Sequence, residues 1–497
     1  MSRFLKALAM ISPDAAMKRM RAQDMLRAYD AAQNGRRTAS FRPGVSSANA
    51  EIGRALPALR ERSSELVRNS PLGSRPLAIL KANVVGTDLT VRFDTGDDKI
   101  DRTAQQLFDD WAQMCDMEGE TSFTGLVALA FSAALERGDA IVRMRAMPLK
   151  SGLPVPLLLH VGEGDLIDET RDVSLFSKDS RARLGVELGE NDQRLGYWLH
   201  RSAPGEPTRL GQNQLVSEFV PRADVCHIYH RLRPGQVRGV PLLTPVLLSA
   251  RDFADLVDAL IVKERMQAAI GLIVESPDAN ASLPGQIAAD SAGDGVRQIT
   301  KLAPGTVNYT RPGEKVTPFI PAGNSSFEPV SQAVLHLIAA GAGVTYDELT
   351  GDTSRSNYTG LRQGKIAARR MIEEMQWHML VPQLIRRITD RFIDHAILAG
   401  RLPDRPGGYP RKYVMPAHEP IDPVKDMQAD ILSVRAGRMS PQDFAGSWGR
   451  DWRVVMKETQ DFFAASDAAG LVFDIDPRQR TRSGADASPP SDQPAED

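Results

Sequence analysis

The sequence predicts an α+β protein that is mainly helical and has more than one domain-sized unit. Residues 246–269 and 365–399 have the length and charge content of long amphipathic helices. Between residues 139 and 231, short apolar runs such as AIVRMRAM and DVCHIYH alternate with Gly, Pro, Asp and Asn, which is typical of strands and turns. At 497 residues the chain is long enough for about three domains of ~150 residues each.

The composition is that of a globular protein and excludes several classes of function. Hydrophobic residues make up 42% of the chain, and 61 basic against 63 acidic residues leave a net charge of -2. A protein that grips nucleic acid tightly needs a basic excess, so a repressor or histone-like role is disfavoured. Two cysteines without a CxxC pair indicate a reducing compartment, with neither a disulfide nor a metal site. No apolar run reaches the ~18 residues of a membrane span, so we expect a soluble, non-secreted protein without membrane contact.

The first half of the chain is expected to hold an arm, several helices and then strands. Residues 1–33 show helical periodicity and are followed by the Ser/Gly/Pro/Arg-rich stretch 36–49, so residues 1–45 are interpreted as an N-terminal arm. A helix over residues 50–84 should break at Asn69-Ser70-Pro71. A second helical unit covers residues 102–136, and the strand-rich part follows.

The stretch RPGQVRGVPLLTPVL, residues 233–247, is termed the junction. Its Gly235, Gly239 and Pro241 predict a turn that leads to Thr244-Pro245, a capping residue followed by proline at the first helical position. The helix that starts there is expected to run from Val246 to Ala269, about 36 Å at 1.5 Å per residue. Its apolar face has helical spacing and consists of Phe253, Leu256, Val257, Leu260 and Ile261.

The second half is predicted to contain turn-rich and helical parts in alternation. Residues 276–325 carry only short β-prone pieces such as GTVNYT, whereas residues 331–344 are helical. The polar stretch 345–364 precedes a helix over Lys365–Ala399, in which Pro382 predicts a kink near Met379 or Leu380. Residues 416–473 read as a short helical domain, and the polar C-terminal residues have the composition of a disordered tail.

Few motifs for covalent chemistry occur. The chain has no GxxxxGK[ST] phosphate loop, no GxSxG and no HExxH, so we expect no catalytic residue, no metal and no cofactor. An alternative is a metal-dependent nuclease or hydrolase that uses Asp347, Glu348 and Asp352. In a loop rich in Thr, Ser and Gly, these carboxylates are better explained as caps of a solvated turn. In CHIYH, strand alternation places Cys226 and His230 on the opposite face from His227.

Two segments together resemble the lambda-type portal proteins of tailed bacteriophages, the head-tail connector family. They have the forms RPGQxRGVPxLxPVL at the junction and VTYDELTGDxSxxNYxxxRxG at residues 344–364. Further matching pieces occur in order, including GDAIVRMR at 138–145 and IDPVKDMQADILSVRAGRMSPQDFAGSWGRDW at 421–452. The similarity covers roughly residues 25–473, and it departs from the family pattern at Thr359-Gly360, where a Ser-Ser pair is usual.

The resemblance implies a portal fold with wing, stem, clip and crown regions, assembled as a homo-oligomeric ring. After the arm at 1–45, it places the wing at 46–243, the first stem helix at 244–276 and the clip at 277–325. The second stem helix is then at 326–344, a channel loop at 345–362, a long kinked wing helix at 363–400, the C-terminal crown region at 401–474 and a disordered tail at 475–497.

The implied function is a dodecameric ring at a capsid vertex through which double-stranded DNA is packaged and ejected, without sequence specificity and without enzymatic activity. The implied partners are further copies of the chain, the terminase large subunit, the major capsid or scaffold protein and a head-tail connector protein. The implied location is the virion, with assembly in the host bacterial cytoplasm. The alternative of the same class is a portal of a domesticated gene-transfer particle.

The resemblance also assigns residues to the channel. The loop set comprises Asp352, Ser354, Arg355, Asn357, Tyr358, Thr359, Arg362 and Lys365. In the stem helix, the candidates to face the channel are Asp252, Asp255, Asp258 and Lys263, a largely acidic set that suits weak, transient contact with sliding DNA.

Overall fold

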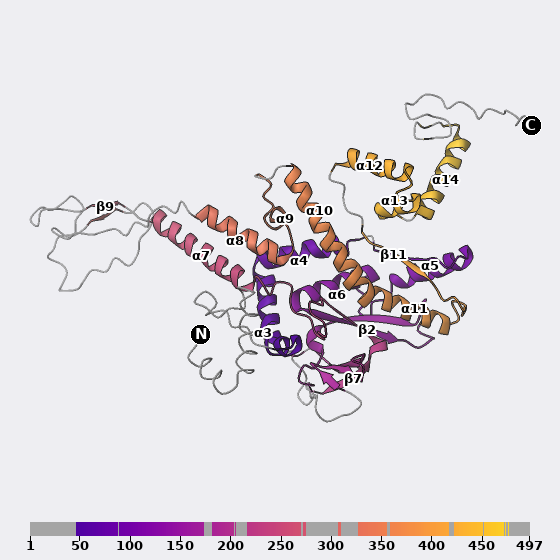
Figure 1. Ribbon diagram of the computed structural model, residues 1–497, viewed down its shortest axis with the longest axis horizontal. Helices are drawn as coiled ribbons and strands as arrows, with labels where there is room; N and C mark the ends of the chain where they lie inside the picture. The colour runs from indigo at the N-terminus through magenta and orange to yellow at the C-terminus, as the bar shows by residue number, and fades with distance from the viewer. Residues whose placement is uncertain are drawn as a thin grey trace, which may run out of the picture. The chain divides into compact units, whose positions relative to one another are not determined.

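The structure is a computed structural model, and Figure 1 shows its course. The chain divides into two units, Met1–Glu51 and Ile52–Asp497, and the second unit contains every strand that the structure describes. The described residues are 46–87, 89–172, 181–202, 204, 216–269, 272–274, 307–309, 327–354, 358–416, 422–450, 452–471, 473 and 476. The predicted arm at 1–45, the tail from 477 and most of the predicted clip therefore lie outside the described residues.

The N-terminal helices break where the sequence predicts. Helix α3 (Ala48–Asn69) ends before α4 (Pro71–Val84), because Ser70 accepts a hydrogen bond from the Leu72 backbone NH and proline occupies the first helical position. The predicted helical unit 102–136 is two helices, α5 (Asp98–Ala112), capped by Asp97, and α6 (Phe123–Arg137). Gly138, with φ 94°, then turns the chain from α6 into a strand.

Two antiparallel sheets account for the predicted strand-rich part. The first has the order β3-β2-β8 and is made of β2 (Asp139–Ala146), β3 (Leu157–Glu163) and β8 (Val225–Tyr229). The second has the order β4-β5-β6-β7 and consists of β4 (Arg181–Arg183), β5 (Val186–Leu188), β6 (Arg194–His200) and β7 (Ser217–Pro221). Of two short 3-10 turns, η3 (Gly164–Leu166) follows β3, and η4 (Arg222–Asp224) connects β7 to β8.

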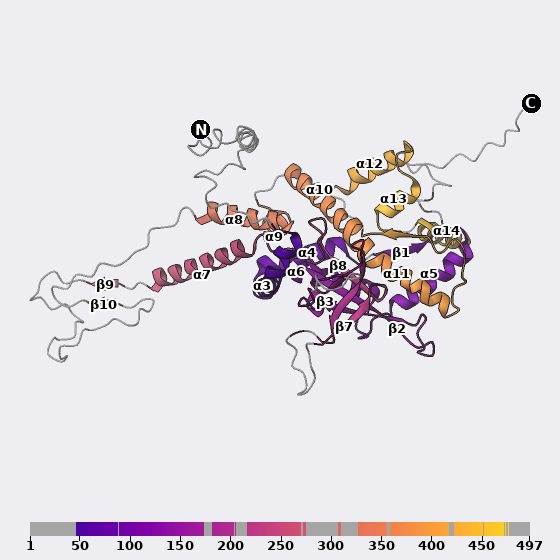
Figure 2. The same ribbon diagram turned by 60° about the horizontal axis from the view of Figure 1, so that its bottom comes forward.

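Both faces of the β3-β2-β8 sheet are covered. Because side chains alternate along a strand, Val142 and Ile228 belong to the large core formed with the helices, whereas Ile141 and Val225 belong to a smaller core shared with the second sheet. Helix α6 packs on β2 and β3 (Figure 2). In the large core, the buried Trp111 donates its indole NH to the Leu157 carbonyl at 2.8 Å. The odd-numbered residues of β2 and β8 thus face the space between the two sheets.

Helices α7 (Leu247–Ala269) and α8 (Phe327–Ala342) lie side by side (Figures 1 and 2). The predicted start of α7 at Val246 is confirmed to within one residue, and the Ala250 NH donates to the Val246 carbonyl at 2.8 Å. The predicted cap at Thr244 was wrong, because residues 242–246 form a separate turn in which the Thr244 hydroxyl donates to the Pro241 carbonyl at 2.6 Å. The described part of α7 reaches Ala269, as predicted. Beyond α7, β9 (Leu272–Val274) pairs in parallel with β10 (Val307–Tyr309), which lies in the β-prone piece GTVNYT.

Residues 345–362, the predicted channel loop, are helical in part. Its first part forms the one-turn helix α9 (Tyr346–Thr350), and α10 (Tyr358–Glu374) begins within its second part. The helix then continues as a π-helical segment, η6 (Met375–Ile385), and as α11 (Arg386–Leu398). The disruption predicted around Met379 is confirmed, and it takes the form of π-helical turns around Pro382, which cannot donate a backbone hydrogen bond.

The C-terminal region contributes one unpredicted strand and three helices. Strand β11 (Arg411–Val414) pairs antiparallel with β1 (Thr90–Phe93), a pairing between distant segments that neither four-residue strand indicates by itself. Helices α12 (Pro423–Arg435), α13 (Pro441–Ser447) and α14 (Trp452–Ala469) follow, as the sequence predicts. No described residue of α12 or α13 is buried, so these helices contribute nothing to the large core.

Candidate functional site: the junction, the stem helices and the loop

The turn in the junction is held by hydrogen bonds of its own glutamine, Gln236. Gly235 has a φ of 76°, in the left-handed region that favours glycine. The buried side chain of Gln236 accepts hydrogen bonds from the backbone NH groups of Leu232 and Arg233, at 2.9 and 3.1 Å, and donates to the Arg238 carbonyl at 2.7 Å. These three bonds replace the regular backbone ladder that the turn lacks.

Two glycines allow the junction to touch the beginning of β2. A Cβ atom added to Gly239 would lie 1.9 Å from the carbonyl oxygen of Gly138, and one added to Gly138 would lie 2.8 Å from backbone atoms of Val240. Neither neighbour is a flexible side chain, so only glycine fits on either side. This close approach places the residues next to the glycines, Asp139 and Arg238, against each other.

The carboxylate of Asp139 is completely buried and pairs with two arginines. The Arg238 guanidinium is also fully buried and donates from Nε to Oδ2 at 2.5 Å, while Arg60 of α3 donates from Nη2 to Oδ1 at 2.7 Å. Although burial opposes ionisation, these guanidinium groups hold the pKa of Asp139 well below its usual value. A third glycine, Gly164, makes room for the carboxylate, since a Cβ there would lie 1.7 Å from Oδ1.

Arg238 and Arg60 extend this ion-pair cluster to neighbouring elements. Arg238 donates to the carbonyls of Leu184 and Gly164, at 3.0 and 2.7 Å, which ties the junction to the second sheet and to η3. Arg60 donates to the Arg137 carbonyl at 3.1 Å and pairs with Asp165 at 2.8 Å. The backbone that enters α7 is therefore held to α3, β2 and both sheets through buried charges.

His227 completes the cluster in a defined tautomer. Arg194 lies 3.0 Å from Nδ1 and can only donate, so Nδ1 is the acceptor and Nε2 carries the proton that it donates to Asp139 at 3.1 Å. Burial lowers the pKa of His227 to about 4, against the raising effect of Asp139. The strand alternation predicted for CHIYH is confirmed: His227 stacks on Tyr229, while Cys226 contacts Met144 on the other face.

The residues selected from the sequence at the junction are only part of this arrangement. Gly235, Gly239 and Pro241 form the turn, whereas Thr244 and Pro245 lie in the short turn before α7. The sequence interpretation missed Asp139, Arg238 and their partners. A signal for them exists in the sequence, because the piece GDAIVRMR and the junction each contain a glycine next to a charged residue, Gly138-Asp139 and Arg238-Gly239, and the two charges have opposite signs.

The predicted apolar face of α7 is only partly covered within one chain. Phe253 packs against the large core, but Leu256 and Ile261 are 40% and 42% exposed. Val257 and Leu260 are half-buried, and Val262 and Met266 add further exposed apolar surface. A helix with this much apolar surface needs a further partner.

The predicted channel-facing residues Asp252, Asp255 and Asp258 are exposed, and Lys263 is half-buried. Asp255 forms an ion pair with Arg251 at 3.3 Å.

The acidic residues near the loop are occupied by backbone groups. Glu348 forms a capping box with Thr345, which closes the N-terminus of α9. Asp352 accepts hydrogen bonds from the backbone NH and hydroxyl of Ser354, at 2.9 and 2.6 Å. The predicted role as a turn cap is confirmed for Glu348 and Asp352. Among the residues that the structure describes, no group of three or more His, Cys, Asp or Glu is arranged to hold a metal.

The remaining loop candidates are separated by the structure. Arg355 and Asn357 lie outside the described residues, and Tyr358 and Thr359 fall in the first turn of α10. Arg362 forms an ion pair with Asp426 of α12, 3.2 Å between Nη2 and Oδ1, so its charge is shared with the C-terminal helices. Lys365 is exposed on α10.

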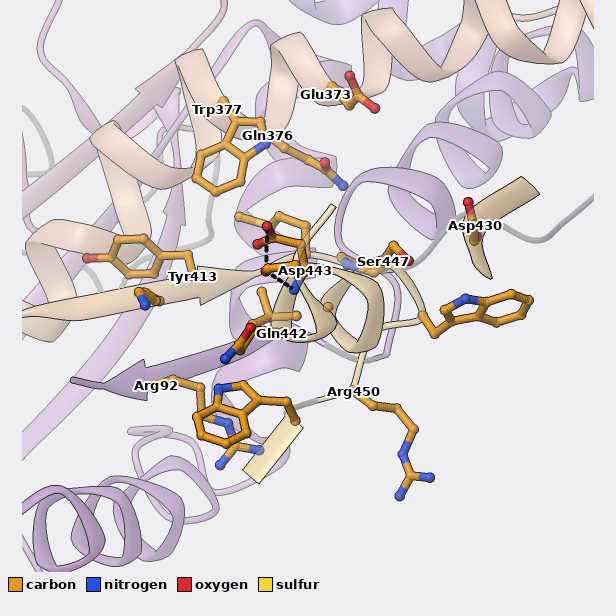
Figure 3. Close-up of a pocket in the computed structure, with 18 of the residues that line it drawn as sticks. Arg92, Glu373, Gln376, Trp377, Tyr413, Asp430, Gln442, Asp443, Ser447 and Arg450 are labelled. Atoms are coloured by element: carbon orange, nitrogen blue, oxygen red, sulfur yellow. Dashed lines mark hydrogen bonds between the residues drawn. The ribbon is translucent and has the colours of Figure 1, made fainter. Parts of the chain in front are cut away.

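A cavity of about 1250 Å³ separates α10 and η6 from the C-terminal helices (Figure 3). Gln376 and Trp377 reach it from η6, Tyr413 from β11 and Asp443 from α13. Besides Arg362–Asp426, an ion pair of 3.4 Å between Arg453 of α14 and Asp94 spans the two sides. Two ion pairs thus connect α12 and α14 to the elements on the other side of the cavity.

Among the described residues, no helix has the length and apolar content needed to cross a bilayer. Both cysteines are buried and unpaired; burial raises the pKa of Cys115 to about 12 and that of Cys226 to about 11, so neither thiol is reactive at neutral pH.

Similarity to known proteins identifies the family. A protein of Halomonas phage phiHAP-1 described as a probable portal protein is 25% identical over 408 residues, which cover 79% of this chain and 77% of that protein. The portal protein of Escherichia phage N15 is 21% identical over 323 residues, covering 58% of this chain and 60% of the relative. Among solved structures, a chain from the neck of a native gene transfer agent particle has a TM-score of 0.42 at 15% identity, covering 78% of this chain and 93% of that one. The family described as phage portal protein, lambda family, matches residues 34–376, well over half of the sequence. The chain therefore belongs to the lambda family of phage portal proteins.

Proposed function

We propose that copies of this chain assemble into a closed ring through which double-stranded DNA passes into and out of a phage capsid. The role is that of a conduit and a docking platform, without covalent chemistry of its own. The observation that carries the proposal is the uncovered apolar surface of α7, in a chain whose family is that of portal proteins. In a ring with cyclic symmetry, each copy offers one face to the preceding copy and another to the next, so such a surface is buried repeatedly.

The regions of the chain are assigned on the same basis. Helices α7 and α8 form the stem, residues 277–325 the clip, and the two sheets with α3–α6, α10, η6 and α11 the wing. Residues 351–357, between α9 and α10, project into the channel, and α12–α14 form the crown. The wing carries the large core, whereas the stem and the crown, which have apolar side chains exposed in a single chain, are completed by neighbouring copies.

Contact with DNA is proposed to be weak and spread over many copies. The exposed Asp252 and Asp258 of α7 repel phosphates, while Lys365 near the loop attracts them. A duplex in such a channel meets no continuous basic groove and is free to slide, in contrast to a protein that binds through many released counterions. The packaging terminase and the connector protein are the proposed partners at the clip, and the capsid or scaffold protein is the proposed partner at the wing.

The ring is tested by negative-stain electron microscopy of the purified protein with rotational averaging. We expect closed rings with a central opening wide enough for a duplex. Size measurements at several salt concentrations accompany the images, because ring contacts that include ion pairs depend on ionic strength. A protein that stays monomeric or dimeric under every condition contradicts the proposal.

A further inference from the structure

Helix α9 directly precedes residues 351–357, and it is held from three sides. Its Leu349 is 4% exposed and belongs to the large core, and Tyr346 stacks on His336 of α8 with ring centroids 4.2 Å apart. The third contact comes from α4, where Arg75 donates from Nε to the Glu348 carbonyl at 2.6 Å. The wing and the second stem helix thus meet at this single helical turn.

Arg75 donates a hydrogen bond to a backbone carbonyl that has no donor within α9. The last carbonyls of any helix have no partner within the helix, and a cation near them is favoured by the helix dipole. In α9 the amide of Gly351 closes on the Asp347 carbonyl at 2.7 Å, so the next carbonyl, that of Glu348, needs another donor. Arg75 supplies it from a position far away in the sequence.

Gly351 ends α9 in the left-handed region that favours glycine, beside the Arg75 guanidinium. Its φ is 75°, and a Cβ atom at this position would lie 3.4 Å from Nη2 of Arg75. The left-handed turn directs the chain past the guanidinium and into Asp352, whose carboxylate holds the backbone of Ser354. Arg75 therefore lies at the point where the chain leaves the last turn of α9.

We infer that Arg75 is a positioning residue for the segment that follows α9: it ties the base of this segment to the wing and so sets the direction in which residues 351–354 leave the helix. The inference rests on the proposed function only for its biological meaning, namely that the segment projects into the DNA channel. The positioning itself is a property of the isolated chain and is measured separately.

The test is a spin label on the segment in the full-length protein. Thr353→Cys gives an exposed thiol, and the native Cys115 and Cys226 are buried, so labelling is selective. With Arg75→Ala added, we expect the ratio of mobile to immobile label to rise about fivefold, the change that corresponds to one hydrogen bond of ~1 kcal/mol. Arg75→Lys, which keeps a cation and a donor, should restore part of the immobile fraction.

Two controls separate positioning from general stability. Arg62→Ala removes another exposed arginine, on α3, and a second label at Leu149→Cys reports on a turn far from α9 in the sequence. Unchanged mobility at Thr353→Cys in the Arg75→Ala variant overturns the inference, as does an equal rise at Leu149→Cys. If rings fail to form in every variant, including the parent, the proposed function fails while the spectroscopic result on Arg75 still stands.

Discussion

Two guanidinium groups and an imidazole converge on the buried carboxylate of Asp139. Such a cluster stabilises a fold only while every charge keeps its partner, because an uncompensated buried charge is costly. At this position the cluster also decides where the chain enters α7, since Arg238 belongs to the junction itself.

Asp139→Asn should therefore destabilise the protein by about 3–5 kcal/mol, the usual cost of breaking a buried ion pair. Denaturant unfolding of the parent and the variant measures the difference. Asp192→Asn is the matched control, because Asp192 pairs with Arg181 at 2.8 Å on the surface and is 73% exposed. It should change stability by less than ~1 kcal/mol. Equal effects of the two substitutions would refute the structural importance of the cluster.

His227 makes stability depend on pH in a defined window. Its pKa is about 4 in the folded protein, below the value of 6.5 of an ordinary histidine, so between these values only the unfolded chain takes up the proton. The contribution of neutral His227 to the free energy of unfolding is on the order of 3 kcal/mol. It is complete above pH 6.5 and is lost as the pH falls towards 4. His227→Gln should flatten the fall of the unfolding free energy between pH 6.5 and 4. The same slope in parent and variant contradicts this assignment.

At the scale of elements, the contact between the junction and the start of β2 depends on backbone touching backbone. Gly239→Ala would place a methyl group 1.9 Å from the Gly138 carbonyl oxygen, so the turn or the strand must move. We expect the free energy of unfolding to fall by about 3 kcal/mol, at the upper end of the range for overpacked sites. Thermal or denaturant unfolding measures this difference. Gly407→Ala is the control, since nothing lies within 4 Å of its added Cβ. A Gly239→Ala variant as stable as this control would show that the close approach does not exist.

The positions of the helices show how much of the secondary structure can be predicted from hydrophobic periodicity. Periodicity and the proline position locate α3, α4, the long helix and its disruption at Pro382, because these depend on residues within a few turns of one another. At the start of α7 the sequence did not show that Thr244 and Pro245 belong to a separate turn, in which both the NH and the hydroxyl of Thr244 donate to the Pro241 carbonyl. The strand pair β1–β11 could not be predicted, since the two four-residue strands lie more than 300 residues apart and each gains its partner only in the folded chain.

At the scale of the whole molecule, the exposed side of α7 is expected to be the contact between copies. Leu256→Asp together with Leu260→Asp should leave the monomer folded, because Leu256 is 40% exposed and Leu260 is half-buried in a single chain. Ring formation should be lost, since the charges would be buried between copies. Circular dichroism and size measurement report on the two properties. Leu149→Asp, at a side chain that is 71% exposed on a turn, is the control and should assemble normally. Rings formed by the α7 variant would exclude this helix as the interface.

Deletion of residues 353–359 should spare the ring but impair the packaging or retention of DNA. The described part of this segment contributes nothing to the large core, and α9 before it is anchored by Leu349 and Arg75. Electron microscopy of the variant and the DNA content of assembled particles measure the two effects. Loss of the ring itself would mean that the segment lies between copies and not in the channel.

The sequence by itself determined the family, the mainly helical character, the strand-rich middle and the interruption at Pro382. These properties depend on local patterns and on motifs that are read along the chain. Only the tertiary structure decided which charges matter: Asp139, Arg60, Arg238 and His227 meet at one point, and Arg75 reaches the carbonyl of Glu348. The physical reason is that the energy of a buried charge or an open carbonyl depends on its partner, and here each partner comes from an element distant in the sequence.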